Sequence, residues 1–407
     1  MRGGLADPRP GYADGPMSAA DPGGVMAPLR RAARFGVTLA ALGAVLGPAP
    51  LGTASESRTT HPERTVAMAA QAPEDSRTLA GRRIVLSYAG PTPPPGVLQT
   101  LREGRAAGVI LFGENITGPE QLAEAVAELK QAAAEAPHPH ALLLMTDQEG
   151  GKVRRLSGAP ELSARRTGQA ANPVGAAVAS GTGAARNLTG AGLNLNLAPV
   201  LDVYDTPDNF IDHSERSYSQ DPSTVGTLGS AFLAAQQGLG VAATAKHFPG
   251  LGAAARGENT DERPVTLDIP LEQIRNRGEA PYRAAIAAGV RMVMASWAVY
   301  PALDPDRPAG LSPAVIQGEL RGRLGFDGVT VTDAMEAGAL TPYGDTGDRA
   351  VAAAEAGMDL LLCSARDPQQ AEDATEALAA ALDSGRLDRH AFTAAVARVD
   401  ALRASLD

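Results

Sequence analysis

The sequence predicts an α/β fold, a TIM (β/α)8 barrel in a single domain. Two observations favour it. Segments typical of buried strands alternate with segments typical of helices from about residue 80 to the end, and several of the strand segments end on a charged residue. A doubly wound sheet is the alternative, but its marker is missing, because Gly181-Thr-Gly183 and Gly250-Leu-Gly252 are broken matches to the glycine pattern that binds dinucleotides.

Eight segments are rich in the apolar and β-branched residues that buried parallel strands prefer. In the seventh of them, Val329 and Val331 alternate with threonines directly after a glycine. Eight such units are the number that a TIM barrel requires. The predicted strands cover residues 84–87, 108–112, 141–147, 193–203, 241–247, 290–296, 329–333 and 358–364.

Helical patterns fill the intervals between these strands. In residues 119–136, Leu122, Val126 and Leu129 fall on one face, and a proline stands in the first turn, where it needs no N–H partner. Gly357 stands at the end of another helix, directly before a strand, as a C-cap. The predicted helices cover residues 119–136, 173–192, 222–238, 281–288, 313–324, 349–356, 368–382 and 388–406.

The composition is that of an ordinary globular protein with a large core. Of the 407 residues, 44% are hydrophobic and 20% are charged, and the formal net charge is −10. Because no run of Lys and Arg lies in the folded part, we expect no nucleic-acid partner. The single cysteine, Cys363, excludes an internal disulfide and a Cys-based zinc cage. We expect no metal and no cofactor.

The first part of the chain is typical of an export leader. After Met26 come Arg30, Arg31 and Arg34, then an apolar run over residues 35–47, then small residues, in the order of a secretory signal peptide. We therefore expect a signal peptide over residues 1–54, with Met17 or Met26 as the true start, and a secreted or cell-envelope protein. The alternative is an uncleaved anchor, but the apolar run is short for a stable membrane span. Residues 55–79 predict a flexible linker, and residues 80–407 the barrel.

Polar groups collect where the predicted strands end. The stretch from Gly325 to Ala334 contains a short buried strand that ends on Asp333. One aspartate after one strand is equally well explained as the N-cap of the next helix. Other strands, however, end on Asp147, near Asp202, and on Lys246-His247. Since the carboxyl ends of barrel strands meet at one mouth, these residues predict a single active site.

The residue types at this mouth suit a ligand that is rich in hydroxyl groups. Carboxylates accept hydrogen bonds from hydroxyls, and Arg, Lys and His donate to them. Trp297 could stack on a sugar face there, although a tryptophan at a strand end is as often packed in the core. The residues expected around the pocket are Asp147, Arg154, Arg155, Asp202, Arg216, Lys246, His247, Ser296, Trp297 and Asp333.

Five blocks of the sequence, in the same order, resemble glycoside hydrolase family 3. They are most similar to its single-domain branch of bacterial β-N-acetylglucosaminidases, the β-hexosaminidases. The blocks cover nearly the whole chain from about residue 80. They are Asp147-Gln-Glu-Gly-Gly-Lys-Val-Arg-Arg155, Asn194-Leu-Asn-Leu-Ala-Pro-Val-Leu-Asp202, Glu215-Arg-Ser-Tyr-Ser-Gln-Asp221, Lys246-His-Phe-Pro-Gly250 and Gly325-Phe-Asp-Gly-Val-Thr-Val-Thr-Asp333.

The resemblance implies a retaining exo-glycosidase that removes terminal β-linked sugars. The nucleophile of the family falls on Asp333, which would form a covalent glycosyl-enzyme. The contact to the outer hydroxyls of the sugar falls on Asp147. The remaining sugar ligands fall on Arg155, Arg216, Lys246 and His247. We expect Lys246 and His247 to lie beside Asp333 and to stabilise its charge. The carbohydrate partner would be a β-glycoside, such as N-acetylglucosamine in peptidoglycan or chitin fragments.

The chain departs from the family pattern at the proton donor. In the acetylglucosaminidase branch an Asp-His pair on the loop after Lys-His-Phe-Pro-Gly plays this role, but residues 251–264 contain no histidine. Asp261 is the first candidate in its place, and Glu262 and Glu258 are the others. Two alternatives remain. In the first, the leaving group is good or the sugar is transferred to an acceptor, so that protonation matters less. In the second, the chain is a catalytically impaired carbohydrate-binding protein on the same barrel.

Overall fold

A computed structural model describes residues 75–137 and 139–406. The predicted signal peptide, residues 1–54, and the predicted linker up to residue 74 lie outside the described residues. Among the helices that the structure describes, none combines the length and apolar character needed to cross a membrane.

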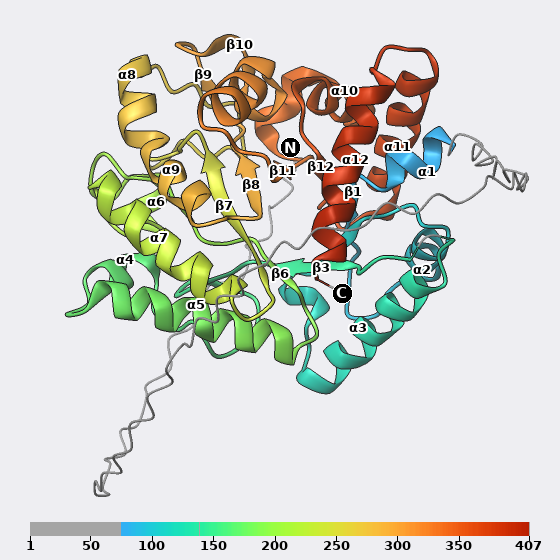
Figure 1. The fold of residues 1–407 in the computed structure, drawn as a ribbon, viewed down its shortest axis with the longest axis horizontal. Helices are drawn as coiled ribbons and strands as arrows, with labels where there is room; N and C mark the ends of the chain where they lie inside the picture. The colour runs from blue at the N-terminus through green and yellow to red at the C-terminus, as the bar shows by residue number, and fades with distance from the viewer. Residues whose placement is uncertain (1–74, 138, 407) are drawn as a thin grey trace, which may run out of the picture. The chain divides into compact units, whose positions relative to one another are not determined.

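The predicted barrel is confirmed. Eight parallel strands close in the order β1-β12-β11-β8-β7-β6-β3-β2, with helices around them (Figure 1). All eight predicted strand positions hold a strand. They are β1 (Ile84–Leu86), β2 (Gly108–Ile110), β3 (Leu143–Thr146), β6 (Leu195–Asn196), β7 (Ala242–Phe248), β8 (Met292–Ala295), β11 (Val329–Ala334) and β12 (Leu360–Leu362).

The surrounding helices also follow the prediction within a few residues. They bury small and branched side chains against the outer face of the barrel. One predicted helix, residues 313–324, is present as a π-helical segment at Ala314–Arg323. The other predicted helices are α3 (Pro119–Ala134), α5 (Pro173–Gly190), α7 (Pro222–Gln237), α9 (Ala280–Ala287), α10 (Thr346–Ala356), α11 (Pro368–Asp383) and α12 (Arg389–Ala404).

The interior of the barrel is filled by side chains and is closed at one end. Inward residues such as Val85, Met145 and Val331 form a core of their own, and Val399 and Leu402 of α12 belong to the same core. Helix α12 therefore seals the end at which the strands begin. The opposite end, at which the strands finish, is left for the loops that carry the predicted site.

Two small hairpins, which were not predicted, lie on loops after strands. One pairs β4 (Gln148–Gly150) with β5 (Val153–Arg154), directly after β3, and the other pairs β9 (Val299–Tyr300) with β10 (Asp304–Pro308), after β8. The predicted strand at 193–203 is shorter than expected. Pro199 has no N–H for a ladder, and beyond β6 only Val200 forms an isolated bridge, to Lys246.

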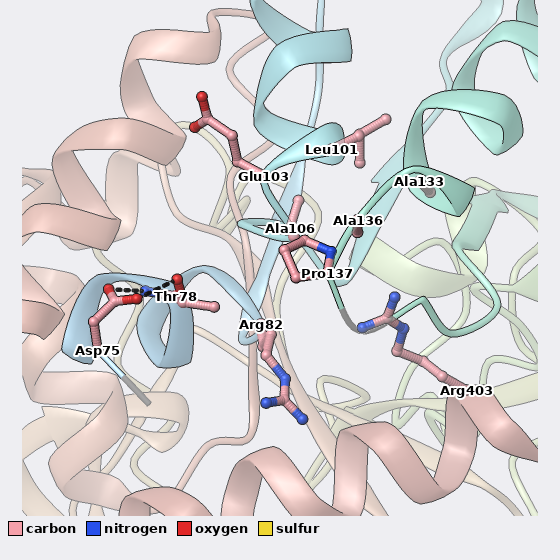
Figure 2. Close-up of a pocket in the computed structure, with 11 residues that line it drawn as sticks. Asp75, Thr78, Arg82, Leu101, Glu103, Ala106, Ala133, Ala136, Pro137 and Arg403 are labelled. Atoms are coloured by element: carbon pink, nitrogen blue, oxygen red, sulfur yellow. Dashed lines mark hydrogen bonds between the residues drawn. The ribbon is translucent and has the colours of Figure 1, made fainter. Parts of the chain in front are cut away.

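The linker prediction is wrong for its last residues, because helix α1 spans Ser76–Gly81. The Asp75 side chain accepts a hydrogen bond from the Thr78 N–H and caps this helix, and Leu79 and Ala80 are buried. Helix α1 packs against α11. Together with α2 (Pro95–Arg102), α3 and α12 it encloses a cavity of about 180 Å³ at the sealed end, with Arg82 and Arg403 on its wall (Figure 2).

Candidate active site

The predicted site residues converge at the open end of the barrel. Asp147 follows β3, Lys246 and His247 belong to β7, and Asp333 belongs to β11. Lys246 Nζ donates to Asp147 Oδ1 at 2.8 Å, although the two residues are 99 positions apart in the chain. Arg155 Nη2 lies 3.4 Å from Asp147 Oδ2. The barrel thus brings Asp147, Arg155 and Lys246 to one point, as the sequence predicted.

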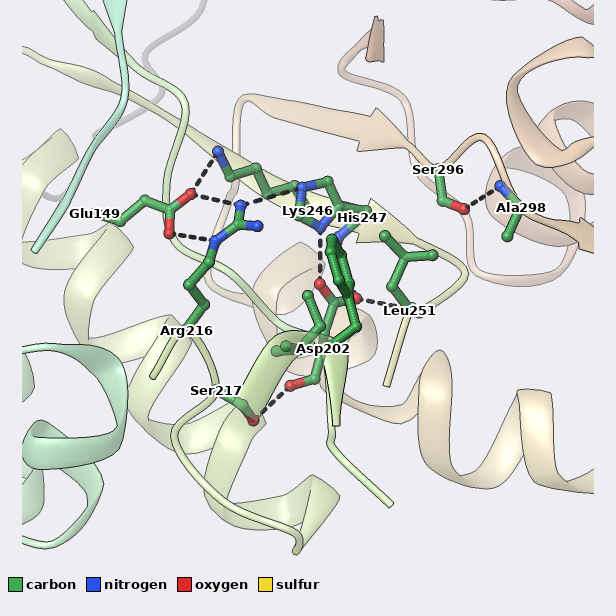
Figure 3. Close-up of polar contacts among 12 residues, drawn as sticks. Glu149, Asp202, Arg216, Ser217, Lys246, His247, Leu251, Ser296 and Ala298 are labelled. Atoms are coloured by element: carbon green, nitrogen blue, oxygen red, sulfur yellow. Dashed lines mark hydrogen bonds and ion pairs between the residues drawn. The ribbon is translucent and has the colours of Figure 1, made fainter. Parts of the chain in front are cut away.

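Glu149 joins Arg216 to Lys246 (Figure 3). Its two carboxylate oxygens accept from Arg216 Nε and Nη2 at 2.9 and 2.8 Å, and Lys246 Nζ lies 2.8 Å from Oε1. The side chains of Lys246 and Glu149 are only 3% and 7% exposed. The geometry of a bidentate pair fixes the plane of the Arg216 guanidinium. Glu149 therefore orients both Arg216 and Lys246.

Glu149 lies in the first of the five family-like blocks, but the resemblance implied no role for it. A usable signal was present. In an extended segment residues i and i+2 point to the same side, and Glu149 stands two positions after Asp147. The β4–β5 hairpin gives this segment its extended shape. The spacing thus predicts two carboxylates on one face, for which Lys246 is the shared partner.

The charges in this group stabilise one another. Burial by itself would raise the pKa of Asp147, but the ammonium of Lys246 and the guanidinium of Arg155 outweigh it and lower that pKa. Burial opposes the charge of Glu149 too, yet Arg216 and Lys246 hold its pKa well below the usual range. Burial would likewise lower the pKa of Lys246, and the two carboxylates raise it instead. All three groups are charged at neutral pH.

His247 is held by a buried carboxylate, Asp202. Asp202 Oδ2 lies 2.7 Å from His247 Nδ1, and Asp202 Oδ1 accepts from the Leu251 N–H at 2.7 Å. A carboxylate only accepts, so Nδ1 is a protonated ring nitrogen in this contact. That leaves Nε2 as the other ring nitrogen, and it lies 3.4 Å from Arg216 Nη2. Asp202 therefore sets the orientation of His247 in the site.

Asp333 does not cap the helix that follows it. Its Oδ1 accepts from the adjacent Ala334 N–H at 2.8 Å, and the helical turn at Gly338–Tyr343 begins after Ala337. The direct contacts of Lys246 and His247 are to carboxylates other than Asp333. Within the described residues no ion pair joins either of them to Asp333, because Lys246 is held by Asp147 and Glu149 and His247 by Asp202.

The loop with the proton-donor candidates is fixed against the segment that follows β11. The Gly338 N–H donates to the Asp261 carbonyl at 2.8 Å, and the Ala339 N–H donates to the Thr260 carbonyl at 3.0 Å. A Cβ at Gly338 would lie 2.2 Å from the Glu262 carbonyl oxygen, so only glycine permits this close approach. These contacts place the loop beside the end of the strand that carries Asp333.

Among the three candidates, Asp261 is the one whose pKa is raised by the charge of Asp333. Asp261 is an exposed residue. Partial desolvation of its carboxyl by the surrounding protein and the negative charge of Asp333 nevertheless raise its pKa to about 6. Glu262 instead accepts from the Asn259 side chain at 3.1 Å, and Glu258 accepts from the Ala255 N–H at 2.6 Å. Their carboxylates are used within the loop itself.

Three residues expected around the pocket serve the scaffold instead. Trp297 is only 1% exposed, and its Nε1 donates to the Ala334 carbonyl at 2.9 Å, so its ring is packed and offers no face to a sugar. Ser296 is buried and bonds to Tyr300 and the Ala298 N–H. Arg154 donates to the Gly158 carbonyl at 2.6 Å. In the described part of the chain, no group of three or more His, Cys, Asp or Glu side chains is placed to hold a metal ion.

Comparisons with known proteins agree on one family. The family model described as "Glycosyl hydrolase family 3 N terminal domain" matches residues 96–402. The chain is 45% identical over 334 residues to a protein of Arthroderma benhamiae described as an uncharacterized secreted glycosyl hydrolase, which covers 82% of this chain and 94% of that one. It is 32% identical over 304 residues to a beta-hexosaminidase of Xylella fastidiosa, covering 73% and 87% of the two chains.

Solved structures give the same result. A glycoside hydrolase family 3 beta-N-acetylglucosaminidase from Paenibacillus superposes with a TM-score of 0.76 at 36% identity, over 81% of this chain and 62% of that one. This chain thus spans less than two thirds of the Paenibacillus protein. A beta-N-acetylhexosaminidase from Beutenbergia cavernae gives a TM-score of 0.74 at 33% identity, over 81% of this chain and 98% of that one.

Proposed function

Because this chain belongs to glycosyl hydrolase family 3 and is a glycosidase, we propose that it is an exported, retaining enzyme that removes terminal β-linked sugars. The observation that carries the proposal is the convergence at one barrel mouth of Asp333, a desolvated Asp261, and the charged network of Asp147, Glu149, Arg216 and Lys246. A nucleophile, a proton donor and a set of hydroxyl ligands are the parts that such a reaction needs.

In the proposed first step, the carboxylate of Asp333 attacks the anomeric carbon. The glycosidic C–O bond breaks, its electron pair goes to the leaving oxygen, and Asp261 gives that oxygen its proton. In the second step Asp261, now ionised, takes a proton from water, and the water oxygen attacks the anomeric carbon and releases Asp333. A pKa of about 6 suits Asp261 to both roles, because the group must hold a proton first and accept one later.

Asp147, Arg155, Arg216, Lys246 and His247 are the proposed sugar ligands. Their partners leave donors and acceptors fixed in direction, so they can hold hydroxyls without rearranging during the reaction. Glu149 and Asp202 act through them, the first by orienting Arg216 and Lys246 and the second by orienting His247. Hydrogen bonds to hydroxyls that tighten as the oxocarbenium ion forms accelerate the chemical step.

The sugar that we propose is N-acetylglucosamine, from peptidoglycan or chitin fragments. It is supported by the names of the Xylella and Paenibacillus proteins, and by the sequence blocks that this chain shares with the acetylglucosaminidase branch. Export is supported by the signal-like residues 1–54 and by the description of the Arthroderma protein as secreted. The proposed site needs no metal and no cofactor.

A mechanism-based fluorosugar tests the nucleophile. The protein is incubated with it, digested, and its peptides are weighed by mass spectrometry. The label is expected on the peptide that contains Asp333 and on no other carboxylate. Fragmentation of that peptide separates Asp333 from Glu336, three residues further along the chain, whose carboxylate accepts from Ser364 Oγ at 2.8 Å. A label on Glu336 would overturn the assignment.

Two matched substitutions test the proton donor. Asp261→Gly should slow the hydrolysis of glycosides with poor leaving groups by about 10²–10⁴-fold, while activated aryl glycosides lose far less. Added azide should restore turnover, because a small anion needs no base to attack the glycosyl-enzyme. Glu262→Gln, on the adjacent residue, should change neither property. The reverse result would move the role to Glu262.

A carbohydrate-binding protein without turnover is the second candidate, and the absence of histidine from residues 251–264 favours it. It predicts saturable binding of a sugar with no product. It also predicts that Asp333→Ala leaves both the binding and the background rate on aryl β-glycosides unchanged.

A further inference from the structure

A second cavity adjoins the site on the side of Arg155. Its volume is about 460 Å³, and it lies between the loop that precedes α3 and the end of α5. Its lining combines apolar side chains with polar and charged ones. The residues that define it for the present purpose are Ile116, Leu122, Leu156, Arg155, Arg186 and Asn187.

Arg155 links this cavity to the proposed active site. Its Nη2 lies 3.4 Å from Asp147 Oδ2, which is long for a charge-assisted bond, and its Nε is buried and has no hydrogen-bond partner among the described residues. A guanidinium with a buried, unpaired N–H retains an unmade hydrogen bond, which a ligand oxygen can complete. Arg155, which lines the cavity, therefore has one N–H left for an anion.

The wall of the cavity is positively charged. Arg186 lines it and forms no ion pair or hydrogen bond with another residue in the described part of the chain. Among the described residues, no carboxylate lines the cavity. The nearby carboxylates are Asp147, which contacts Arg155 from the site, and Glu120, which comes within 4.0 Å of a Cβ built on Gly118. Asn187 Nδ2 donates to the carbonyls of Ser157 and Ala159, and these bonds leave Asn187 Oδ1 as an acceptor.

We propose that this cavity is a subsite for a carboxylate carried by the non-reducing sugar, bound between Arg155 and Arg186. The inference rests on the proposed function, in which Asp147 contacts the outer hydroxyls of that sugar. A substituent on those hydroxyls passes by Arg155 and enters the cavity, where the apolar lining residues accommodate its carbon atoms. The carboxylate can belong to the ring itself, as in a uronic acid, or to an ether on a ring oxygen, as in a lactyl sugar.

Matched pairs of sugars test the proposal. Glucose is compared with glucuronic acid, and N-acetylglucosamine with N-acetylmuramic acid, each as the aryl β-glycoside and as the free sugar. In the wild type we expect the acid of at least one pair to be favoured over its neutral partner. Arg186→Gln should weaken that acid by about tenfold and leave the neutral sugar unchanged, because one charge-assisted hydrogen bond is lost. Lys152→Gln, which removes an exposed charge outside the cavity, is the control.

The two readouts separate this inference from the proposed function. Kinetics with the aryl glycosides require turnover, whereas calorimetry with the free sugars does not. If acid and neutral sugars bind alike, or if Arg186→Gln and Lys152→Gln have the same effect, the subsite is overturned even in an active enzyme. If the acids bind through Arg186 but nothing is turned over and Asp333 takes no label, the subsite stands and the proposed hydrolase fails. The pair that responds tells which position of the sugar carries the carboxylate.

Discussion

The barrel carries a cluster of charged side chains at each end, and the two clusters share their chemistry but differ in their surroundings. The open-end cluster consists of Asp147, Glu149, Arg216 and Lys246. The sealed-end cluster consists of Asp359, Arg83, Arg321 and Arg398. Asp359 accepts from Arg321 Nη2 at 2.6 Å and from Arg398 Nη2 at 2.7 Å, and its backbone carbonyl accepts from Arg83 Nε at 3.1 Å.

The two clusters differ in access to solvent and in the use of their donors. The Asp359 side chain is 0% exposed, and helix α12 supplies Arg398 while it closes the barrel. At the open end Arg155, the neighbour of the cluster, keeps 33% of its side chain exposed and has an unpaired N–H. A buried ion pair is therefore no sign of catalysis by itself. Two features distinguish a functional cluster from a structural one. They are the end of the barrel at which the cluster lies and the hydrogen-bond donors that it leaves for a ligand.

Asp333→Asn is expected to give the largest effect. Removing the proposed nucleophile should lower kcat/KM on para-nitrophenyl N-acetyl-β-glucosaminide by roughly ten-thousand-fold or more, with little change in thermal stability. Asp327→Asn is the matched control, because Asp327 is an exposed aspartate just before the same strand, at the sealed end. Equal slow turnover by the wild type and both variants would remove the functional difference between the ends.

Asp359→Asn should affect stability and not activity. The change leaves Arg321 and Arg398 without their buried counter-charge, which lowers the free energy of unfolding by about 3–5 kcal/mol. Asp359 lies at the end of the barrel where the strands begin, and the site lies at the end where they finish. Because of this distance, kcat/KM of the folded fraction should change by less than about twofold. Urea unfolding and kinetics on the same preparation measure both. A folded but inactive variant would show that the sealed end is coupled to the site.

Glu149→Gln should lower activity more than stability. The amide keeps the size of the side chain but weakens its hold on Arg216 and Lys246, so kcat/KM should fall roughly a hundredfold through misplaced sugar ligands. The loss of stability should be smaller than for Asp359→Asn, since Lys246 keeps Asp147 as a partner. Glu161→Gln, an exposed carboxylate on the following segment, serves as the control. A variant that is destabilised but fully active would reduce Glu149 to a structural role.

The pH profile should report Asp261. Desolvation and the charge of Asp333 raise its pKa to about 6, so the proton that the first step requires is present below that pH and is lost above it. For a substrate with a poor leaving group, kcat/KM should fall about tenfold for each pH unit above 6. In Asp261→Asn this alkaline limb should disappear. A limb that persists there would assign it to another group.

The sequence predicted the fold and much of the site because both depend on periodic patterns. Apolar segments such as 329–333 identify strands, and parallel strands bring Asp147, Lys246 and Asp333 to the same mouth without further information. What the sequence could not supply was the choice of partners. From the sequence, Lys246 could pair either with Asp333 or with a carboxylate after β3. The β4–β5 hairpin presents Glu149, and in the structure Lys246 pairs with Glu149 and Asp147.

Residues whose role depends on burial were also beyond the sequence. The sequence makes Trp297 a candidate for stacking on a sugar. In the structure its ring packs against Gly310, where a Cβ would lie 2.5 Å from Trp297 Cζ3. The sequence places Glu258, Asp261 and Glu262 on one loop and ranks Asp261 first only by its approximate position. Hydrogen bonds within the loop separate them, because those bonds occupy Glu258 and Glu262 and leave Asp261 facing the charge of Asp333.

Asp75→Ala is expected to have the smallest effect, at the sealed end. The substitution removes the cap of α1, because the Asp75 side chain accepts from the Thr78 N–H at 2.9 Å and from Thr78 Oγ1 at 2.7 Å. The free energy of unfolding should fall by about 1 kcal/mol, and kcat/KM should not change. Thr78→Val is a second variant that keeps the backbone cap and removes only the hydroxyl bond, so it should be milder. If either variant altered kcat/KM, the separation of a structural end from a functional end would not hold, because α1 lies where the strands begin and the site lies where they finish.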